Sequence, residues 1–505
     1  MSRTKSAAVQ FSGAMVLMVL SAVQGLILVP LYLYYIGGYL YGAWLAIAGS
    51  VILFGLADMG ISSLVVQQSA VFHSRADYCS LAKLVGTMHV VNALSIVIIL
   101  ILGFCFIPFI PQWLNVSSQY HHLLVMVAWL TVLDLVLMLL VNVSGAVLLG
   151  IQNPLPHMFA SIIGTLISII AIYLLLSLGF GVLALSVGAL AKPLIVLPAN
   201  MFNLNLFLSR NNVTSKVRFE YKMFKNLISK SLWLGPSKIA ETLSDQVDNI
   251  IIARVLGVGF VTVLAVTKKV AELSVQVVGR VSASLLSGLS HLHGSGQEET
   301  QKQVIKTLLT VVVYAGGIAL GGYLVFNESF VSMWIGSQYY GGNLLTCWIF
   351  IYCALKLLRI SLYNIVFSVG EISLSAKSTV TEVSLQALLG LAFTIKMGLP
   401  GMVLGAILGV ISATVMQLSA LFSRRLISSS VIFKLFLKAG LSLICVVLPA
   451  YYISKAIGLQ GWGSFTSTVL GYLLLSLFVV YIAERDLAVN MWGSISRQMR
   501  AAFQC

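Results

Sequence analysis

The sequence predicts an all-α protein that crosses a membrane about fourteen times, and three observations lead to this fold class. Of the 505 residues, 59% are hydrophobic and only 9% are charged, whereas a soluble domain carries roughly 25% charged residues. The apolar runs reach the roughly 20 residues that a helix needs to cross a bilayer. They do not alternate in polarity over about ten residues, as the strands of a membrane barrel do. The composition therefore excludes a soluble enzyme, a nucleic-acid-binding domain and a disulfide-based scaffold.

Fourteen apolar runs along the chain are long enough to be spans. A glycine-rich turn at residues 179–181 separates the fifth run from the sixth, and a basic stretch follows the sixth. The predicted spans are residues 9–35, 42–69, 84–110, 121–149, 157–180, 182–208, 231–256, 259–288, 304–326, 343–369, 373–396, 401–423, 435–455 and 464–483.

The distribution of Lys and Arg predicts the orientation of these spans. With the N-terminus in the cytoplasm, the cytoplasmic segments hold twenty Lys and Arg residues and the opposite segments hold two, Lys396 and Lys455. Both termini are therefore expected in the cytoplasm. The expected organisation is an N-lobe of six spans at 1–209, a basic cytoplasmic linker at 210–230, a C-lobe of six spans at 231–426, and two further spans with a cytoplasmic tail at 427–505.

The loops and the remaining composition exclude several kinds of site. The net charge of +15 comes from bases in short loops rather than on one polar face, which argues against a nucleic-acid partner. The six Cys residues follow no metal-binding spacing, so we expect no metal, cofactor or catalytic residue. No stretch outside the spans exceeds about 25 residues and no phosphate-binding loop motif occurs, which excludes an ATP-binding module. A transporter, a channel or a membrane enzyme with small loops remains.

Charged residues inside the predicted spans gather in the second half of the chain. An ionisable residue at the centre of a spanning helix costs about 2.5–3.5 kcal/mol, so it usually faces a partner or water. At about 100° per residue, three spans each carry their polar residues on one face. The stripes are Lys238, Glu241, Asp245 and Asp248; Lys268, Glu272 and Gln276, flanked by Lys269 and Arg280; and Trp348, Tyr352, Lys356, Arg359 and Tyr363.

Two interpretations of these stripes remain open. In the first, the charges only stabilise helices, since Lys238 and Glu241 are spaced i, i+3 and Lys268 and Glu272 are spaced i, i+4. In the second, they line a hydrated cavity in which basic residues outnumber acidic ones near the centre, so that an anionic group such as a diphosphate binds there. The candidate substrate-binding residues are Lys268, Lys269, Arg280, Lys356, Arg359 and Tyr352.

Acidic residues in the spans are candidates for binding a coupling cation or a proton. They are Glu241, Asp245, Asp248, Glu272 and Asp58, and for Asp58 an acid bonded between packed helices is an equal alternative. A separate pattern of Gly401, Gly405 and Gly409 at four-residue spacing predicts a smooth ridge for close helix packing.

Several segments are similar to one family of membrane proteins. Pro30–Gly37 (PLYLYYIG), Tyr41–Trp44 (YGAW) and Leu56–Ile61 (LADMGI) resemble the opening of Wzx-type polysaccharide flippases, which belong to the multidrug/oligosaccharidyl-lipid/polysaccharide (MOP) exporter superfamily. Asp245–Gly257 resembles the opening of that family's second half, and Gly401–Ala406 resembles its glycine-rich closing helix. With an offset of 220 residues, Ile36-Gly37 also aligns with Leu256-Gly257, as a weak internal repeat.

The resemblance implies a fold and a function. It implies a MATE-like fold in which two lobes alternate access, and a substrate that is an undecaprenyl-diphosphate-linked oligosaccharide such as an O-antigen repeat unit. This substrate would move from the cytoplasmic to the periplasmic leaflet of the bacterial inner membrane, with H⁺ or Na⁺ antiport as the energy source. Expected partners are this lipid-linked oligosaccharide, membrane lipids and a polysaccharide polymerase or assembly machinery. A lipid-II-type flippase and a multidrug or cation antiporter of the same superfamily are alternatives, and a membrane polysaccharide polymerase is disfavoured for lack of a large loop.

Overall fold

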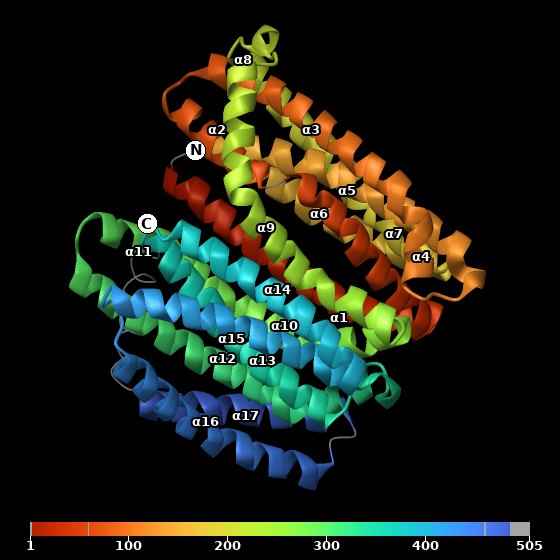
Figure 1. Ribbon diagram of the computed structural model, residues 1–505, viewed down its shortest axis with the longest axis vertical. Helices are drawn as coiled ribbons and strands as arrows, with labels where there is room; N and C mark the ends of the chain where they lie inside the picture. Colours follow the sequence, from red (N-terminus) through yellow and green to blue (C-terminus); the bar gives the residue numbers. More distant parts are fainter. Residues whose placement is uncertain (1–2, 59, 459–460, 485–505) are drawn as a thin grey trace. The chain divides into compact units, whose positions relative to one another are not determined.

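The structure, a computed structural model, describes residues 3–58, 60–458 and 461–484, and within these ranges every regular element is a helix (Figure 1). The all-α fold class predicted from the composition is therefore confirmed. Three of the predicted features lie outside the described residues: the cytoplasmic tail from residue 485 on, and the side chains of Asp58 and Asp245.

The chain divides into two compact units, Met1–Thr262 and Val263–Cys505. The first unit contains α1 Arg3–Ile52, α2 Ile61–Ser74, α3 Tyr78–Phe106, α4 Ile110–Trp113, α5 His121–Gly150, α6 Leu155–Ser177, α7 Leu183–Ala189, α8 Ala191–Arg210 and α9 Tyr221–Val255. Helix α10, Val258–Ser284, begins in the first unit and continues in the second. The second unit also contains α11 Leu286–Gly294, α12 Glu298–Trp334, α13 Asn343–Ser368, α14 Ile372–Met397, α15 Leu399–Ser423, α16 Ser429–Ile457 and α17 Trp462–Ala483.

Each of the fourteen predicted spans falls on helix, but the count of fourteen is not confirmed. Eleven helical segments in the described part of the chain are long and apolar enough to cross a membrane. Most of the first predicted span and residues 42–55 of the second fall in one such segment, because α1 joins two helices at a kink at Gly37, where φ is 74° and ψ is 164°; the end of the second predicted span falls on α2. Helices α9 and α10 are not among the eleven. These two helices carry two of the three predicted polar stripes, whereas α13, which carries the third, is among the eleven.

The first unit has an apolar core where α2, α3, α5, α8 and α9 meet, with Val65, Leu84, Leu148, Leu208 and Leu227 among its buried residues. The stretch predicted as a linker is docked on α3. Lys83 Nζ lies 3.0 Å from Glu220 Oε2, and the Glu220 backbone amide donates to Thr87 Oγ1 at 3.1 Å. Helix α9 begins directly afterwards at Tyr221, so the second half of the stretch 210–230 is helical rather than loop.

The internal repeat has a structural counterpart at two glycines of the first unit. Gly37 and Gly257, aligned by the offset of 220, both have positive φ values of 74° and 104°, a conformation that costs glycine little. The helical turns that follow Gly37 and Gly257 pack closely against each other. The Thr262 hydroxyl donates to the Gly38 carbonyl at 2.6 Å, and a Cβ at Gly42 would lie 1.9 Å from the Val258 carbonyl oxygen. The offset of 220 aligns Gly38 with Val258 and Gly42 with Thr262. The contact between Gly38 and Thr262 is therefore the repeat-related counterpart of the contact between Gly42 and Val258.

In the second unit, α15 packs closely on α14, and the glycine ridge predicted from the sequence is confirmed. A Cβ at Gly401 would lie 2.2 Å from the Phe393 carbonyl oxygen, and one at Gly405 would lie 2.3 Å from the Gly390 nitrogen. At Gly409 the nearest atom would be the Glu382 carbonyl oxygen, at 2.5 Å. Because these three positions of α15 carry no side chain, the backbone of α14 comes close to them. The contact at Gly409 fixes the position of Glu382.

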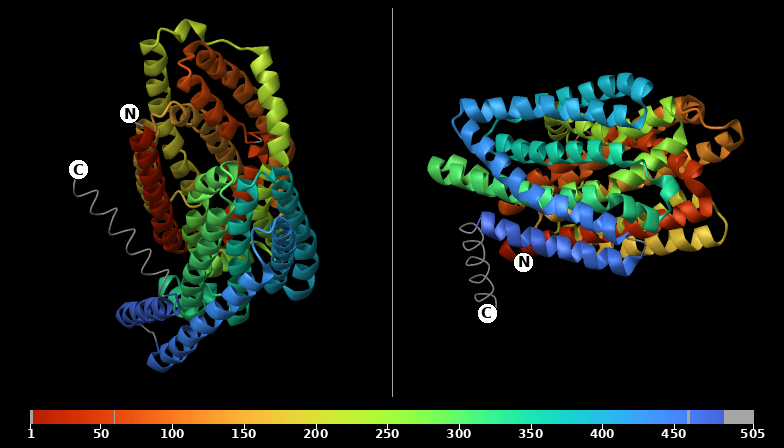
Figure 2. Two further views of the ribbon diagram at one scale, coloured as in Figure 1. Left: turned by 90° about the vertical axis from the view of Figure 1, so that its left-hand side faces the viewer. Right: turned by 90° about the horizontal axis from the view of Figure 1, so that it is seen from below.

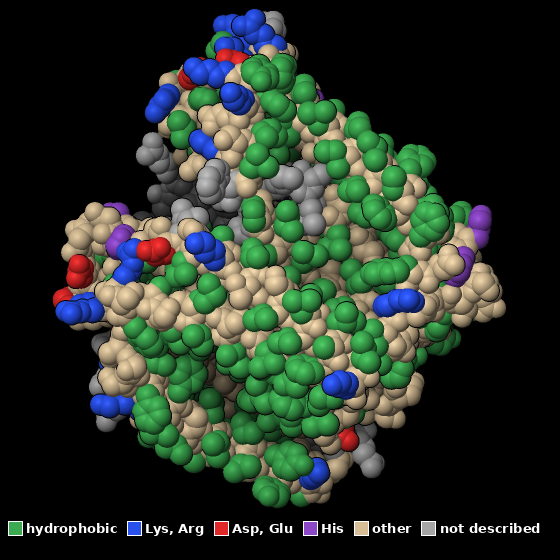
Figure 3. All heavy atoms as spheres, viewed as in Figure 1, with side chains coloured by type: hydrophobic (Ala, Val, Ile, Leu, Met, Phe, Trp, Pro, Cys, Tyr) green, Lys and Arg blue, Asp and Glu red, His purple; other side chains and the backbone are tan. Residues whose placement is uncertain are grey.

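The last two helices pack against α12. Tyr472 of α17 donates from its hydroxyl to the Ile318 carbonyl at 2.8 Å, and Val325, Phe326, Val446 and Ala450 are buried around it. Helices α16 and α17 lie side by side (Figure 2). Their outer faces expose large apolar side chains, and hydrophobic side chains cover much of the second unit on the face in Figure 3. An apolar outer surface of this kind is what contact with lipid requires.

Candidate functional site: a basic cluster on α10, α13 and α14

Helix α10 is fixed at the residue before its first lysine. The Thr267 carbonyl accepts hydrogen bonds from Tyr323 Oη at 3.2 Å and Asn327 Nδ2 at 3.1 Å, both on α12. The Thr267 hydroxyl also accepts a hydrogen bond from the Gly341 backbone amide at 2.9 Å. Tyr323 and Asn327 are 2% and 1% exposed. These buried contacts hold the turn from which Lys268 projects, and the sequence analysis did not single out either residue.

Lys268 and Glu272 form the ion pair that their i, i+4 spacing allows. Lys268 Nζ lies 2.9 Å from Glu272 Oε1, and the two side chains are 16% and 40% exposed. Lys269 and Lys356 also lie near enough to Glu272 for their charges to act on its carboxylate. Helices α10 and α13 are in direct contact, since Ser282 Oγ and Ser361 Oγ are 2.6 Å apart. One carboxylate on α10 is therefore surrounded by lysines from two helices.

The predicted face of α13 holds two pairs, each made of one tyrosine ring and one cation. Lys356 Nζ lies 5.4 Å from the centre of the Tyr352 ring, and Arg359 Cζ lies 5.4 Å from the centre of the Tyr363 ring. A cation within about 6 Å of an aromatic ring is attracted to its face. Each tyrosine is four residues from its cation, so one turn of helix brings each pair together.

Arg359 has a partner that the sequence analysis missed. Its Nε lies 2.6 Å from Glu382 Oε2 on α14, and its Nη2 donates to Thr379 Oγ1 at 2.8 Å. The Arg359 side chain is 13% exposed and that of Glu382 is 3% exposed. Nε and Oε2 are close but not aligned as donor and acceptor, so the attraction between them is chiefly Coulombic. A signal was available, because Ser375, Ser378, Thr379, Glu382 and Gln386 form a fourth polar stripe and all are buried.

The cluster carries a surplus of positive charge in the middle of its helices. Lys268, Lys269, Lys356 and Arg359 contribute four positive charges, and Glu272 and Glu382 contribute two negative ones. Arg359 is matched by the buried Glu382, whereas three lysines surround the single carboxylate of Glu272. The part of the cluster open to a ligand is therefore net positive.

The other predicted site residues of the described chain lie further along α10 and on α9. Arg280 is exposed and stands eight residues beyond Glu272 on α10, about 12 Å along the helix axis. On α9, which belongs to the first unit, Lys238 Nζ lies 2.7 Å from Glu241 Oε2, with both side chains more than half exposed. Asp248 is half-buried on the same helix. Among the described residues, no group of three or more His, Cys, Asp and Glu side chains is arranged to hold a metal ion.

Comparisons with known proteins agree with this architecture. A family model described as "Polysaccharide biosynthesis protein" matches residues 41–341. The structure of the "Lipid II flippase MurJ, inward closed conformation" superposes with a TM-score of 0.72 at 15% sequence identity, and the match covers 95% of this chain and 100% of that one. An inward-facing "multidrug resistance MATE family transporter of the MOP superfamily" gives a TM-score of 0.64 at 16% identity, covering 82% of this chain and 94% of that one. Among curated proteins, none matches the chain significantly.

These matches confirm the resemblance to the MOP superfamily and the MATE-like fold that it implied. The solved structures of this fold are of flippases and transporters, and they share the fold at low sequence identity. Because the family model covers more than half of the sequence, the chain belongs to the polysaccharide biosynthesis protein family, and it has the fold of the MOP-superfamily flippases and transporters.

Proposed function

We propose that the protein is a flippase that moves an undecaprenyl-diphosphate-linked oligosaccharide, of the O-antigen type, from the cytoplasmic to the periplasmic leaflet of the bacterial inner membrane. The observation that carries this proposal is the group of three lysines around Glu272 in the middle of two membrane helices. Isolated charges at this depth are costly, and they are retained where they face water, each other or a charged ligand.

The chemistry of a polyprenyl diphosphate suits this cluster. Its diphosphate concentrates negative charge, which Lys268, Lys269 and Lys356 would meet with charge-assisted hydrogen bonds. Tyr352 stands beside Lys356 and would offer a ring face to a sugar. Arg359 is held by Glu382, so its proposed role is to fix α13 against α14 rather than to close on the ligand itself. The polyprenyl chain would remain in lipid while the headgroup crosses.

The energy source that we propose is antiport of H⁺ or Na⁺. The sequence contains no phosphate-binding loop for ATP. Glu272 is the acid that we place in this role, because it is paired with Lys268 and the charges of Lys269 and Lys356 also act on it. Glu241 and Asp248 on α9 are the next candidates, and Asp245 and Asp58 are retained from the sequence. In this proposal the binding site opens to each side of the membrane in turn as the two lobes move. Both termini face the cytoplasm. A polysaccharide polymerase or assembly machinery receives the translocated lipid-linked oligosaccharide.

A second candidate function is transport of a lipid-II-type substrate. It is favoured by the match to MurJ, which extends over nearly the whole of both chains and has a higher TM-score than the MATE match. Both candidate substrates are polyprenyl diphosphates, so the lysine cluster serves either one. A multidrug or cation antiporter fits less well, because a cationic drug would be repelled by a net positive site.

Complementation separates these candidates. The gene is expressed in a strain that lacks its Wzx-type flippase, with surface glycan as the readout, and in a strain depleted of MurJ, with growth as the readout. Restored glycan without restored growth supports the proposal, and the converse supports the lipid-II alternative. Restoration of neither, at normal amounts of membrane-inserted protein, with resistance to cationic drugs instead, would replace both with the antiporter.

Thiol labelling tests the physical basis of the proposal. The six native Cys residues are first replaced, and single Cys residues are then introduced at Lys268, Glu272, Lys356 and Arg359. We expect a water-soluble thiol reagent to label all four positions, with positions 268 and 359 labelled more slowly because their native side chains are only 16% and 13% exposed. Leu391, which is 42% exposed on α14, is the lipid-facing control. If none of the four positions reacts from either side of the membrane, no hydrated path reaches the cluster.

A further inference from the structure

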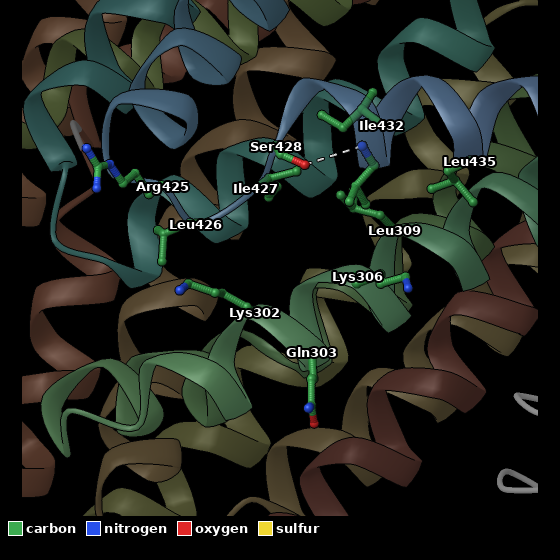
Figure 4. A pocket seen from close by; sticks show the side chains of 11 residues that line it. Lys302, Gln303, Lys306, Leu309, Arg425, Leu426, Ile427, Ser428, Ile432 and Leu435 are labelled. Atoms are coloured by element: carbon green, nitrogen blue, oxygen red, sulfur yellow. Dashed lines mark hydrogen bonds between the residues drawn. The ribbon is translucent and has the colours of Figure 1, made fainter.

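A pocket in the second unit lies well away in sequence from the cluster on α10, α13 and α14. It is formed by the first turns of α12, the loop after α15 and the first turns of α16, and it encloses about 290 Å³ (Figure 4). No residue of the lysine cluster lines it. Its lining residues are Lys302, Gln303, Lys306, Leu309, Arg425, Leu426, Ile427, Ser428, Val431, Ile432 and Leu435.

The polar part of this pocket is basic. Lys302 and Lys306 flank its lower side in Figure 4, one turn apart on α12, while Gln303 points away from it. Lys302 is paired with Glu299 at 2.7 Å, and Glu299 is 81% exposed. Lys306 and Arg425 have no carboxylate within ion-pair distance among the described residues, whereas the neighbouring Arg424 is paired with Glu371. The pocket therefore offers two unneutralised cations and no acidic lining residue.

The remaining lining is apolar, and the helix that supplies part of it, α16, is apolar on its exposed side as well. Six of the eleven lining residues are Leu, Ile or Val. Beyond them, α16 exposes Phe433, Phe436 and Leu437, at 68%, 41% and 52%. The Ser428 hydroxyl is used as the cap of α16, because it accepts from the Val431 amide at 3.4 Å (Figure 4). A small soluble anion would leave this apolar wall unused, and a neutral lipid would leave the two cations unused. An anionic amphiphile matches both.

We propose that this pocket binds the phosphate headgroup of an anionic glycerophospholipid from the surrounding bilayer, with the headgroup facing the basic rim of Lys302, Lys306 and Arg425 and an acyl chain along the apolar lining. Basic pockets between membrane helices on the cytoplasmic side are suited to anionic headgroups. The Lys and Arg distribution predicts that this end of α12, α15 and α16 faces the cytoplasm. The bound lipid would join the start of α12 to the start of α16. This role is independent of the substrate that the protein transports.

Lipid retention by the full-length protein tests this proposal. The protein is reconstituted with phosphatidylglycerol or phosphatidylcholine, and the bound lipids are counted by native mass spectrometry. We expect one phosphatidylglycerol to be retained, and its apparent affinity to fall about tenfold or more in the double variant Lys306→Ala/Arg425→Ala. The matched control is Lys434→Ala/Lys377→Ala, which removes two exposed lysines of the same unit that do not line the pocket.

A second variant separates a fitted pocket from general attraction to a charged surface. Ile432→Trp fills the apolar wall without changing the charge, and we expect it to lower phosphatidylglycerol retention as well. Equal loss in the control double variant, or equal retention of phosphatidylcholine, would overturn the proposal. Displacement by millimolar inorganic phosphate alone would show a site for a soluble anion instead. Preferential retention of a polyprenyl phosphate over phosphatidylglycerol would show that the pocket serves the transported lipid, which also contradicts the proposal.

Discussion

Two ion pairs in the second unit have similar distances but different surroundings. Arg359 and Glu382 join α13 to α14 at 2.6 Å and are almost fully enclosed, at 13% and 3% exposure. Lys268 and Glu272 lie on one helix, 2.9 Å apart, and Glu272 is 40% exposed with further lysines nearby. Breaking an enclosed pair leaves a charge without solvent, whereas breaking a half-open pair leaves a charge that water or a ligand can satisfy. Under the function that we propose, Arg359–Glu382 serves chiefly stability and Lys268–Glu272 chiefly binding.

The largest loss of stability is expected from removing one partner of the enclosed pair, Arg359 and Glu382. In Glu382→Ala the guanidinium of Arg359 stays buried without its counter-charge, and we expect a loss of about 3–5 kcal/mol in stability. The measurement is the fraction of monodisperse protein left after heating in detergent. The double variant Arg359→Leu/Glu382→Leu should regain most of this loss, since it leaves no unpaired charge. If the Glu382→Ala protein were as heat-stable as the wild type, the enclosed pair would not stabilise the protein more than the half-open pair does.

A smaller effect is expected when the enclosed pair is disturbed without changing a charge. Gly409→Ala places a Cβ 2.5 Å from the Glu382 carbonyl oxygen, so α14 must shift. We expect a loss of about 1–3 kcal/mol by the same heating assay. The matched control is Gly440→Ala on α16, where a Cβ meets no atom within 4 Å. There the better helix propensity of Ala should leave the stability unchanged or raise it by about 1 kcal/mol. Equal behaviour of the two variants would contradict the tight ridge.

Neutralising the lysines near the half-open pair, Lys268 and Glu272, tests whether this part of the cluster acts in transport rather than in stability. For Lys269→Gln and Lys356→Gln we expect heat stability close to that of the wild type and transport lowered about tenfold each, because a hydrogen bond between charged groups is lost. Surface glycan in the complemented flippase-deficient strain is the readout, normalised to the amount of protein in the membrane. Normal glycan with both variants would show that the cluster does not contact the substrate.

The smallest change in stability is expected at the exposed ion pair of the first unit. Lys238 and Glu241 lie on one helix with 56% and 63% of their side chains exposed. Replacing both by Gln should change the stability by no more than about 0.5 kcal/mol, because water already screens the pair. Heating assays on Lys238→Gln/Glu241→Gln provide the baseline for the two pairs of the second unit. A loss similar to that of Glu382→Ala would mean that exposure does not decide the strength of these pairs.

Part of the candidate site could be predicted because it follows from positions along a single helix. The pairs Lys268–Glu272 and Lys238–Glu241 and the faces of α13 depend only on helical spacing, and the structure contains them. Glu382 was missed, although its stripe on α14 has the same spacing, because Arg359 on the neighbouring helix was assigned to the ligand. The count of fourteen spans is not confirmed, because eleven helical segments of the described chain are long and apolar enough to cross a membrane, and helical spacing does not show which helices do so. Gly37 has a non-helical backbone and joins two helices at a kink within Arg3–Ile52.

The sequence by itself determined the fold class, the positions of the helices, the glycine ridge and the sign of the charge in the middle of α10 and α13. These features depend on composition and on spacings of three or four residues, which a helix converts directly into a face. Only the tertiary structure decided that Arg359 is neutralised by Glu382, that Thr267 is held by Tyr323 and Asn327, and that the start of α12 and the start of α16 enclose a basic pocket. Each of these pairings joins different helices, and helix packing is set by the shape of whole surfaces rather than by the spacing of residues along one chain segment.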